Sequence, residues 1–129
     1  MREIKFRGFS TDLNKWVYGY YVKDPMGKHR IYGKPFEEAS SNTYYFVTPE
    51  SVGQFTGLHD KNGVEIYEGD ILDCQDRIVK VFWNNQCAQF DTNFIRYQFD
   101  LCSNGIANVE WKYRAIVIGN LYQNPELIK

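Results

Sequence analysis

Residues 57–72 constrain the fold of this chain more than any other segment. The segment contains two turn signals, and apolar residues alternate with polar ones between them, as expected for a strand with one buried face. The turn residues are Asp60, Asn62, Gly63, Glu68, Gly69 and Asp70. The segment therefore predicts two successive turns joined by a short strand.

The first of these turns also predicts a register. A three-residue loop that ends at Gly63, with this glycine in the left-handed conformation, places Asp60 opposite Val64. The same register places Leu58 opposite Ile66, so apolar side chains face each other. We expect a β-hairpin here, followed by a second sharp bend into the next strand.

A calcium-binding loop is the first functional interpretation of these acids. The spacing Asp60-x-Asn62-Gly63 is similar to the start of an EF-hand loop. An EF-hand requires a carboxylate at its twelfth position, and this chain has Ile71 there. The acids are therefore interpreted as turn residues, and no metal or other cofactor is expected.

Composition supports a fold built from strands. Ten Tyr, nine Phe and three Trp occur among 129 residues, and aromatic side chains favour a half-buried, pleated surface. The predicted fold class is mainly β with antiparallel strands. Residues 1–56 are expected to form an N-terminal β-hairpin region with a long loop and a short helix. Residues 57–129 are expected to form a small SH3-like barrel, unless both parts make one continuous domain.

Residues 2–23 alternate as expected for the first hairpin. On the return strand, Trp16, Tyr18, Tyr20 and Val22 alternate with the intervening residues, so one face is expected to be apolar and the other basic and aromatic. Residues 34–42 carry loop-forming residues and are expected to form a long loop.

Two segments predict short helices. In Thr48-Pro49-Glu50 the threonine is a possible cap, proline is tolerated at the first helical position, and Gly57 is expected to end the helix. Asn124-Pro125-Glu126 repeats the pattern near the end of the chain.

The C-terminal half predicts a further hairpin. A two-residue turn at Asn84-Asn85 pairs Val81 with Ala88 and Val79 with Phe90. This register keeps the alternating apolar residues on one face of the sheet.

Five segments of the sequence are familiar when taken together. In chain order they are Met1–Arg7, Thr48–Leu58, Asp60–Gly63, Ile66–Ile71 and Ile118–Leu127. The set resembles the YopX family of phage and prophage proteins. The resemblance implies a mainly β fold, a phage or prophage origin and a location in the cytoplasm of the bacterial host. The family has no assigned activity, so the resemblance implies no catalytic residues.

The residues themselves offer little for catalysis. The best acidic cluster is Glu65, Glu68, Asp70 and Asp73 beside His59. Two of these acids flank strand ends, where acids are normally solvated, and Asp70 fits a turn-capping role. A metal-dependent enzyme is therefore the least favoured interpretation, and we expect no enzymatic activity.

The leading hypothesis is a non-catalytic interaction module that binds a protein partner or assembles with itself. Exposed aromatic side chains are typical of protein interfaces. The candidate interface residues are Tyr20, Tyr21 and Tyr45.

The alternative hypothesis is a weak nucleic-acid-binding small β-barrel. The candidate patch consists of Lys5, Arg7, Lys15, Arg96, Lys112 and Arg114. A net charge of −1 gives no general attraction for polyanions, so nucleic-acid binding is less favoured than protein binding. No segment approaches the length needed to cross a membrane, so no membrane partner is expected.

Overall fold

The computed structural model of the chain describes residues 3–34, 43–75, 77–97 and 115–128. Antiparallel strands make up most of this part, and its helices are two short 3₁₀ turns. None of the described helices is long and apolar enough to cross a membrane. The mainly β fold predicted from the sequence is therefore confirmed. The chain divides into two compact units, Met1–Phe55 and Thr56–Lys129, which are described separately below.

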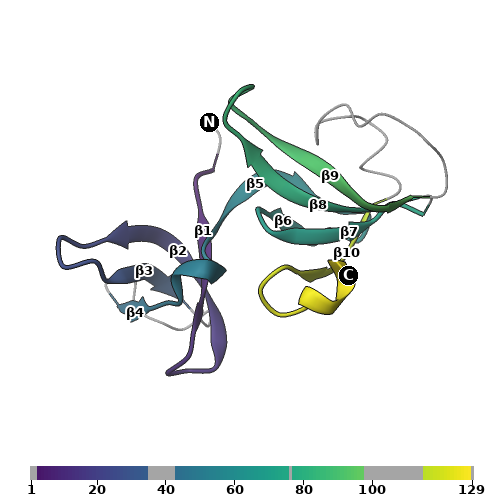
Figure 1. Cartoon of the computed structure of the whole chain (residues 1–129). Helices are drawn as coiled ribbons and strands as arrows, with labels where there is room; N and C mark the ends of the chain where they lie inside the picture. The colour runs from purple at the N-terminus through teal and green to yellow at the C-terminus, as the bar shows by residue number, and fades with distance from the viewer. Residues whose placement is uncertain (1–2, 35–42, 76, 98–114, 129) are drawn as a thin grey trace. The chain divides into compact units, whose positions relative to one another are not determined.

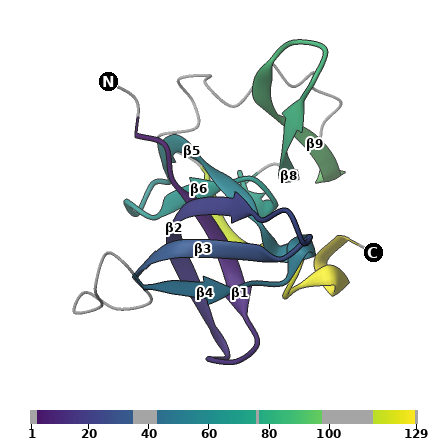
Figure 2. The same ribbon diagram turned by 90° about the vertical axis from the view of Figure 1, so that its left-hand side faces the viewer.

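The N-terminal unit contains one antiparallel sheet. Its strands are β1 (Phe6–Ser10), β2 (Lys15–Lys23), β3 (His29–Lys34), β4 (Tyr44–Phe46) and the start of β5 (Gly53–His59). They lie in the order β4-β3-β2-β1-β5, and Figure 2 shows β2, β3 and β4 side by side. The hairpin expected over residues 2–23 is confirmed by the antiparallel pairing of β1 with β2.

The core of this unit lies on one face of the sheet. Val17 and Ile31 are fully buried, and Val47 is nearly so. Tyr21 and Tyr45 pack against this cluster from β2 and β4. Neighbouring residues of a strand point to opposite faces, so the alternation in the sequence predicted two faces. It did not predict that the face with Val17 would be the buried one.

Strands β2 and β3 approach each other closely at a pair of glycines. Gly19 lies opposite Gly33 in the ladder. A Cβ atom on Gly33 would overlap the carbonyl oxygen of Tyr18, and one on Gly19 would overlap that of Tyr32. The pairing of β2 with β3 therefore requires the absence of a side chain at both positions.

The helix predicted after Thr48 is a single 3₁₀ turn, η1 (Pro49–Ser51). The side chain of Thr48 makes no capping bond. Instead, the hydroxyl of Ser51 donates to the Thr48 carbonyl at 2.6 Å and accepts from the amide of Phe9 at 2.7 Å. The expectation that the helix runs to Gly57 is wrong, because β5 already begins at Gly53.

The C-terminal unit contains the rest of β5 and five further strands. These are β6 (Glu65–Tyr67), β7 (Asp70–Asp73), β8 (Arg77–Asn84), β9 (Gln89–Tyr97) and β10 (Ile116–Asn120), followed by η2 (Pro125–Ile128). Strand β6 follows β5 in one sheet, and the other sheet has the order β10-β7-β8-β9 (Figure 1). The SH3-like barrel expected here is not found, because the described strands form two open sheets without closure.

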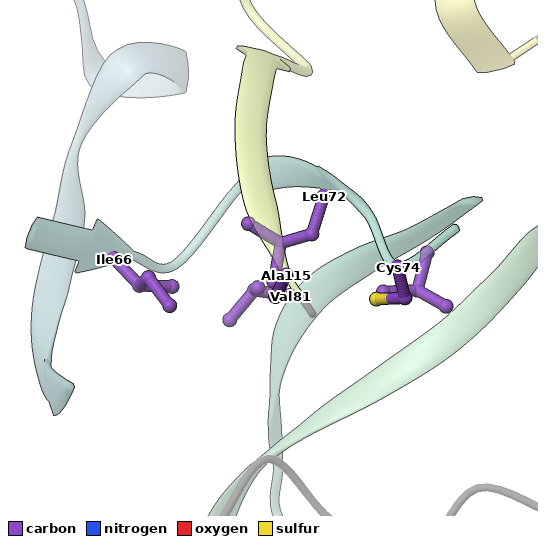
Figure 3. Close-up of a cluster of buried hydrophobic side chains, with 6 residues drawn as sticks. Ile66, Leu72, Cys74, Val81 and Ala115 are labelled. Carbon is purple, nitrogen blue, oxygen red and sulfur yellow. The ribbon is translucent and has the colours of Figure 1, made fainter. Parts of the chain in front are cut away.

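The core of the C-terminal unit gathers side chains from several strands. Figure 3 labels five of them, Ile66, Leu72, Cys74, Val81 and Ala115, and the buried cluster also includes Val79. All six are at most 4% exposed. Packing in this cluster therefore adds to the ladder bonds that hold the short strands β6 and β7.

The β8–β9 hairpin differs from its predicted register. Asn84 pairs with Gln89, so four residues form the loop, and Val81 lies opposite Thr92 rather than Ala88. The Asn84 side chain accepts hydrogen bonds from the amides of the second and third residues after it, at 3.0 and 3.3 Å. Asparagine favours such local turns, which places Asn84 before the loop and not at its centre. The predicted pairing of Val79 with Phe90 is wrong for the same reason.

Candidate functional site

Asp60 is a structural clamp. This side chain is buried, and its Oδ1 accepts hydrogen bonds from the amides of Asn62 at 2.8 Å and Val64 at 2.9 Å. Its Oδ2 accepts a hydrogen bond from the amide of Val117 at 2.9 Å. The amide of Asp60 also donates to the Val64 carbonyl at 2.8 Å, which confirms their predicted pairing. Gly63 has a φ of 83°, as expected for the left-handed loop residue.

The second turn is also structural. Gly69 has a φ of 92°, and its amide donates to the carbonyl of Val81 at 2.9 Å. The buried Asp70 accepts a hydrogen bond from the Tyr67 amide through Oδ2 at 2.8 Å. Glu68, the first residue of this turn, is half-buried. Four of the six predicted turn residues, Asn62, Gly63, Glu68 and Gly69, lie in the two turns. Asp60 directly precedes the first turn and Asp70 begins β7 directly after the second, and their hydrogen bonds stabilise these turns.

The acidic cluster does not form a metal centre in the described residues. No group of three or more His, Cys, Asp or Glu side chains there has a suitable arrangement. Glu65 accepts a hydrogen bond from the Tyr67 hydroxyl at 3.0 Å, and Asp73 caps the amide of Gln75 at 2.9 Å.

The three tyrosines predicted as an interface do not share one surface. Tyr20 is 71% exposed. Tyr45, on β4, packs against the core of the unit. Tyr21 also packs there, with its hydroxyl 2.5 Å from Nδ1 of His29 and its ring stacked on the imidazole. Of these three tyrosines, only Tyr20 therefore lies on the face opposite the core.

The face with Tyr20 carries a group of aromatic residues that the sequence did not single out as a set. The ladders join Tyr20, Tyr32 and Tyr44 in one row across β2, β3 and β4. The next row on this face joins Val22, Arg30 and Phe46. We name this surface the outer aromatic face, and its residues are Tyr18, Tyr20, Val22, Arg30, Tyr32, Tyr44 and Phe46.

Most of the outer aromatic face is accessible to solvent. Its more exposed side chains, from 38% to 71%, are Tyr18, Tyr20, Val22, Tyr44 and Phe46. Singly exposed apolar residues are normal, but a contiguous patch of them marks an interaction site. The patch depends on the pairing of β2 with β3 and of β3 with β4, which the sequence did not predict.

Arg30 orders one corner of the outer aromatic face. Its guanidinium carbon lies 4.9 Å from the ring centroid of Tyr44 and 5.7 Å from that of Phe46. The Tyr44 ring also contacts Tyr32, with centroids 5.5 Å apart, and Phe46, at 5.6 Å. Cation–π and edge-to-face contacts of this kind fix ring orientation. The three rings are therefore positioned before any partner arrives.

Asp24 connects Arg30 to the β2–β3 turn. One carboxylate oxygen of Asp24 lies 2.5 Å from Nη2 of Arg30. The other accepts hydrogen bonds from the amides of Met26 at 2.9 Å and Lys28 at 2.8 Å. The hydrogen bond from Arg30, followed by those from the two amides, lowers the pKa of Asp24. The same pair raises the pKa of Arg30.

The turn that Asp24 caps is expected to loosen when the pH falls below 3.8, the ordinary pKa of this carboxyl group. Because the pKa of Asp24 is lowered on folding, its stabilising effect is complete above the ordinary value of 3.8 and is lost as the pH falls through the lower folded value. An NMR titration of the Met26 and Lys28 amide shifts should show a midpoint below 3.8. In Arg30→Gln the midpoint should move up towards 3.8, and an unchanged midpoint would contradict the assigned cause.

The candidate nucleic-acid patch is only partly described. Lys5 lies 3.2 Å from Glu3 and above the Phe55 ring, while Arg7 is buried and stacks on Trp16 with 4.7 Å between guanidinium carbon and ring centroid. Lys15 is exposed. The side chain of Arg96, together with Lys112 and Arg114, lies outside the described residues.

Comparison with known proteins gives a family and a similar structure. A family model described as YopX protein matches residues 5–129. The crystal structure of protein EF1440 from Enterococcus faecalis is similar, with a TM-score of 0.63, 26% sequence identity and coverage of 100% of both chains. Comparison with curated proteins finds no match.

Proposed function

The chain belongs to the YopX family, and from that premise we propose that it is a non-catalytic interaction module encoded by a phage or prophage. It binds a protein partner or a second copy of itself through the outer aromatic face. The observation that carries this proposal is the contiguous, solvent-accessible set of aromatic side chains on β2, β3 and β4.

The composition of the face supports a protein partner. Protein interfaces are enriched in Tyr, Phe and Arg and depleted of Lys, Glu and Asp at their centre. The outer aromatic face consists of four tyrosines, one phenylalanine, one valine and one arginine. The rings of Tyr32, Tyr44 and Phe46 contact one another, so these three lose little side-chain entropy on binding.

Nucleic acid is the second candidate, and the face supports it less well. Binding to single strands combines stacking rings with several cations along the backbone. Among the described side chains of this sheet face, the cations are Arg30 and the buried Arg7, and the ladder places Lys34 opposite Tyr18. A protein partner needs fewer charges, so it is the proposed one. The cytoplasm of the bacterial host is the proposed location.

Replacement of two exposed rings tests the proposal. In Tyr20→Ser/Phe46→Ser, partners retained by the wild-type protein from a lysate of a lysogenic host should be lost, because truncating a side chain at the centre of an interface costs about 2 kcal/mol or more. Light scattering of both proteins should show in parallel whether wild-type self-association is lost in the variant.

Trp83→Ser is the matched control, because it removes an exposed ring, 39% accessible, from β8 in the other unit. This variant should retain what the wild-type protein retains. Equal retention by all three proteins would overturn the proposal, as would a wild-type protein that is monomeric and retains nothing. Salt-sensitive retention on single-stranded DNA that requires the same two rings would favour the nucleic-acid candidate instead.

A further inference from the structure

From the position of Arg30 we infer that the outer aromatic face recognises an acidic segment of a different protein. A carboxylate of that segment binds Arg30, and an apolar side chain next to it lies on the rings of Tyr20, Tyr44 and Phe46. This inference rests on the proposed function and adds the chemistry of the partner.

Arg30 has the geometry of a carboxylate site that is only partly used. It is 25% exposed, and Asp24 contacts it through one oxygen at Nη2. A guanidinium presents several N–H donors in a planar fork that matches a carboxylate. The contact with Asp24 therefore shows that this guanidinium binds a carboxylate. Asp24 contacts a single nitrogen, so other N–H groups of Arg30 can donate to a second carboxylate.

The surrounding rings favour the same ligand. The guanidinium is flanked by the Tyr44 and Phe46 rings, which limit the access of water and strengthen a charged contact beside them. A segment that pairs a carboxylate with an aromatic or branched apolar side chain satisfies both the charge and the exposed rings. A purely acidic or a purely apolar segment satisfies only one of them.

The charge of the surrounding sequence also fits an acidic partner. Residues 15–34 contain a single acid, Asp24, which is already bound to Arg30, and the ladder places two basic residues of this segment, Arg30 and Lys34, at positions of this face. No Asp or Glu occupies a position on the outer aromatic face. Complementary charge across an interface speeds association and excludes partners of like charge.

A second copy of the chain is a less suitable occupant. Most soluble homodimers are twofold symmetric, so the same patch on both copies meets itself. Twofold pairing of this face would offer Arg30 no carboxylate from the other copy, because the face carries no acid and Asp24 is already bound to the Arg30 of its own chain. An acidic segment of another protein supplies the complementary charge that a second copy lacks.

A displayed random-peptide library selected on the full chain tests the inference. Wild-type protein should enrich peptides that carry Asp or Glu next to Trp, Phe or Leu. Arg30→Gln should lose the preference for acids while keeping the preference for apolar residues. Tyr20→Ser/Phe46→Ser should lose both, and Trp83→Ser should behave as wild type.

Asp24→Asn provides a readout that a merely structural role of Arg30 would not produce. This variant removes the negative charge that partly neutralises the guanidinium, so a selected acidic peptide should bind about threefold more tightly, as expected for one partly exposed ion pair. The binding of that peptide to the wild-type protein should weaken as salt is added. Circular dichroism of each variant controls for folding.

Each failure has a distinct meaning. Peptides that need Tyr20 and Phe46 but show no preference for acids would overturn the inference and leave the proposed function standing. Peptides that bind Tyr20→Ser/Phe46→Ser as well as wild type, or no enrichment at all, would contradict both. Enrichment of basic peptides, or acidic peptides that Arg30→Gln binds equally well, would overturn the role of Arg30.

Discussion

Asp60→Ala is expected to lower the free energy of unfolding by about 3 kcal/mol, because three backbone amides lose a charged acceptor together. Two of these amides belong to the loop that follows Asp60, and the third is that of Val117. Solvent can reach the exposed loop residues but less easily the half-buried Val117. The cost of losing the third bond should therefore dominate.

Urea denaturation followed by circular dichroism measures this loss, and hydrogen exchange locates it. The Val117 amide should lose protection in Asp60→Ala. In Asp60→Asn its protection should lie between those of Asp60→Ala and the wild-type protein, because the side-chain carboxamide keeps one acceptor oxygen. Lys61→Ala, at the exposed next residue, is the control and should unfold as the wild-type protein does. Unaltered protection of Val117 in Asp60→Ala would show that Asp60 is not the clamp.

Gly33→Ala is expected to lower the free energy of unfolding of the N-terminal unit by about 3 kcal/mol, the upper range for overpacking. The added methyl group would overlap the carbonyl oxygen of Tyr18, which is backbone and not a flexible side chain. Strand β3 would have to move away from β2. The row that joins Tyr20, Tyr32 and Tyr44 would then be broken.

Gly27→Ala is the matched control for a glycine substitution in the same hairpin. A Cβ atom there meets nothing within 4 Å, but the φ of 85° disfavours a side chain, so its cost should be about 1 kcal/mol. Thermal unfolding and the ring-current shifts of Tyr32 and Tyr44 distinguish the two variants. A Gly33→Ala protein with wild-type stability and shifts would show that β2 and β3 do not approach closely.

The sequence predicted which segments form strands better than it predicted how these strands pair. Turn chemistry identified the loop at Gly63 and the pairing of Asp60 with Val64, because these depend on residues close in the chain. The β8–β9 register failed because Asn84 has two ways to form a turn, as a central residue or as a side-chain acceptor. The error was a shift by an even number of residues, so Val79 and Val81 still face the core.

The candidate site was less predictable because it depends on pairing between distant residues. Alternation along β2 already separates Tyr20 from Tyr21, but only the ladder places Tyr45 on the same face as Tyr21, where both pack against the core. The role of Arg30 depends on Tyr44 and Phe46, which follow it 14 and 16 residues later in the chain. No pattern within a short stretch of the sequence predicts a contact between residues so far apart in the chain.

The paired glycines of β2 and β3 offer a way to search for further chains of this kind. Turn acids such as those around Asp60 occur in many hairpins, whereas two glycines at ladder-paired positions within aromatic strands are required by this particular close approach. A relative that keeps the sheet should retain both glycines or replace them with a bulge. A pattern that combines Gly19, Gly33 and the alternating aromatics should therefore find the outer aromatic face even where the turns have diverged.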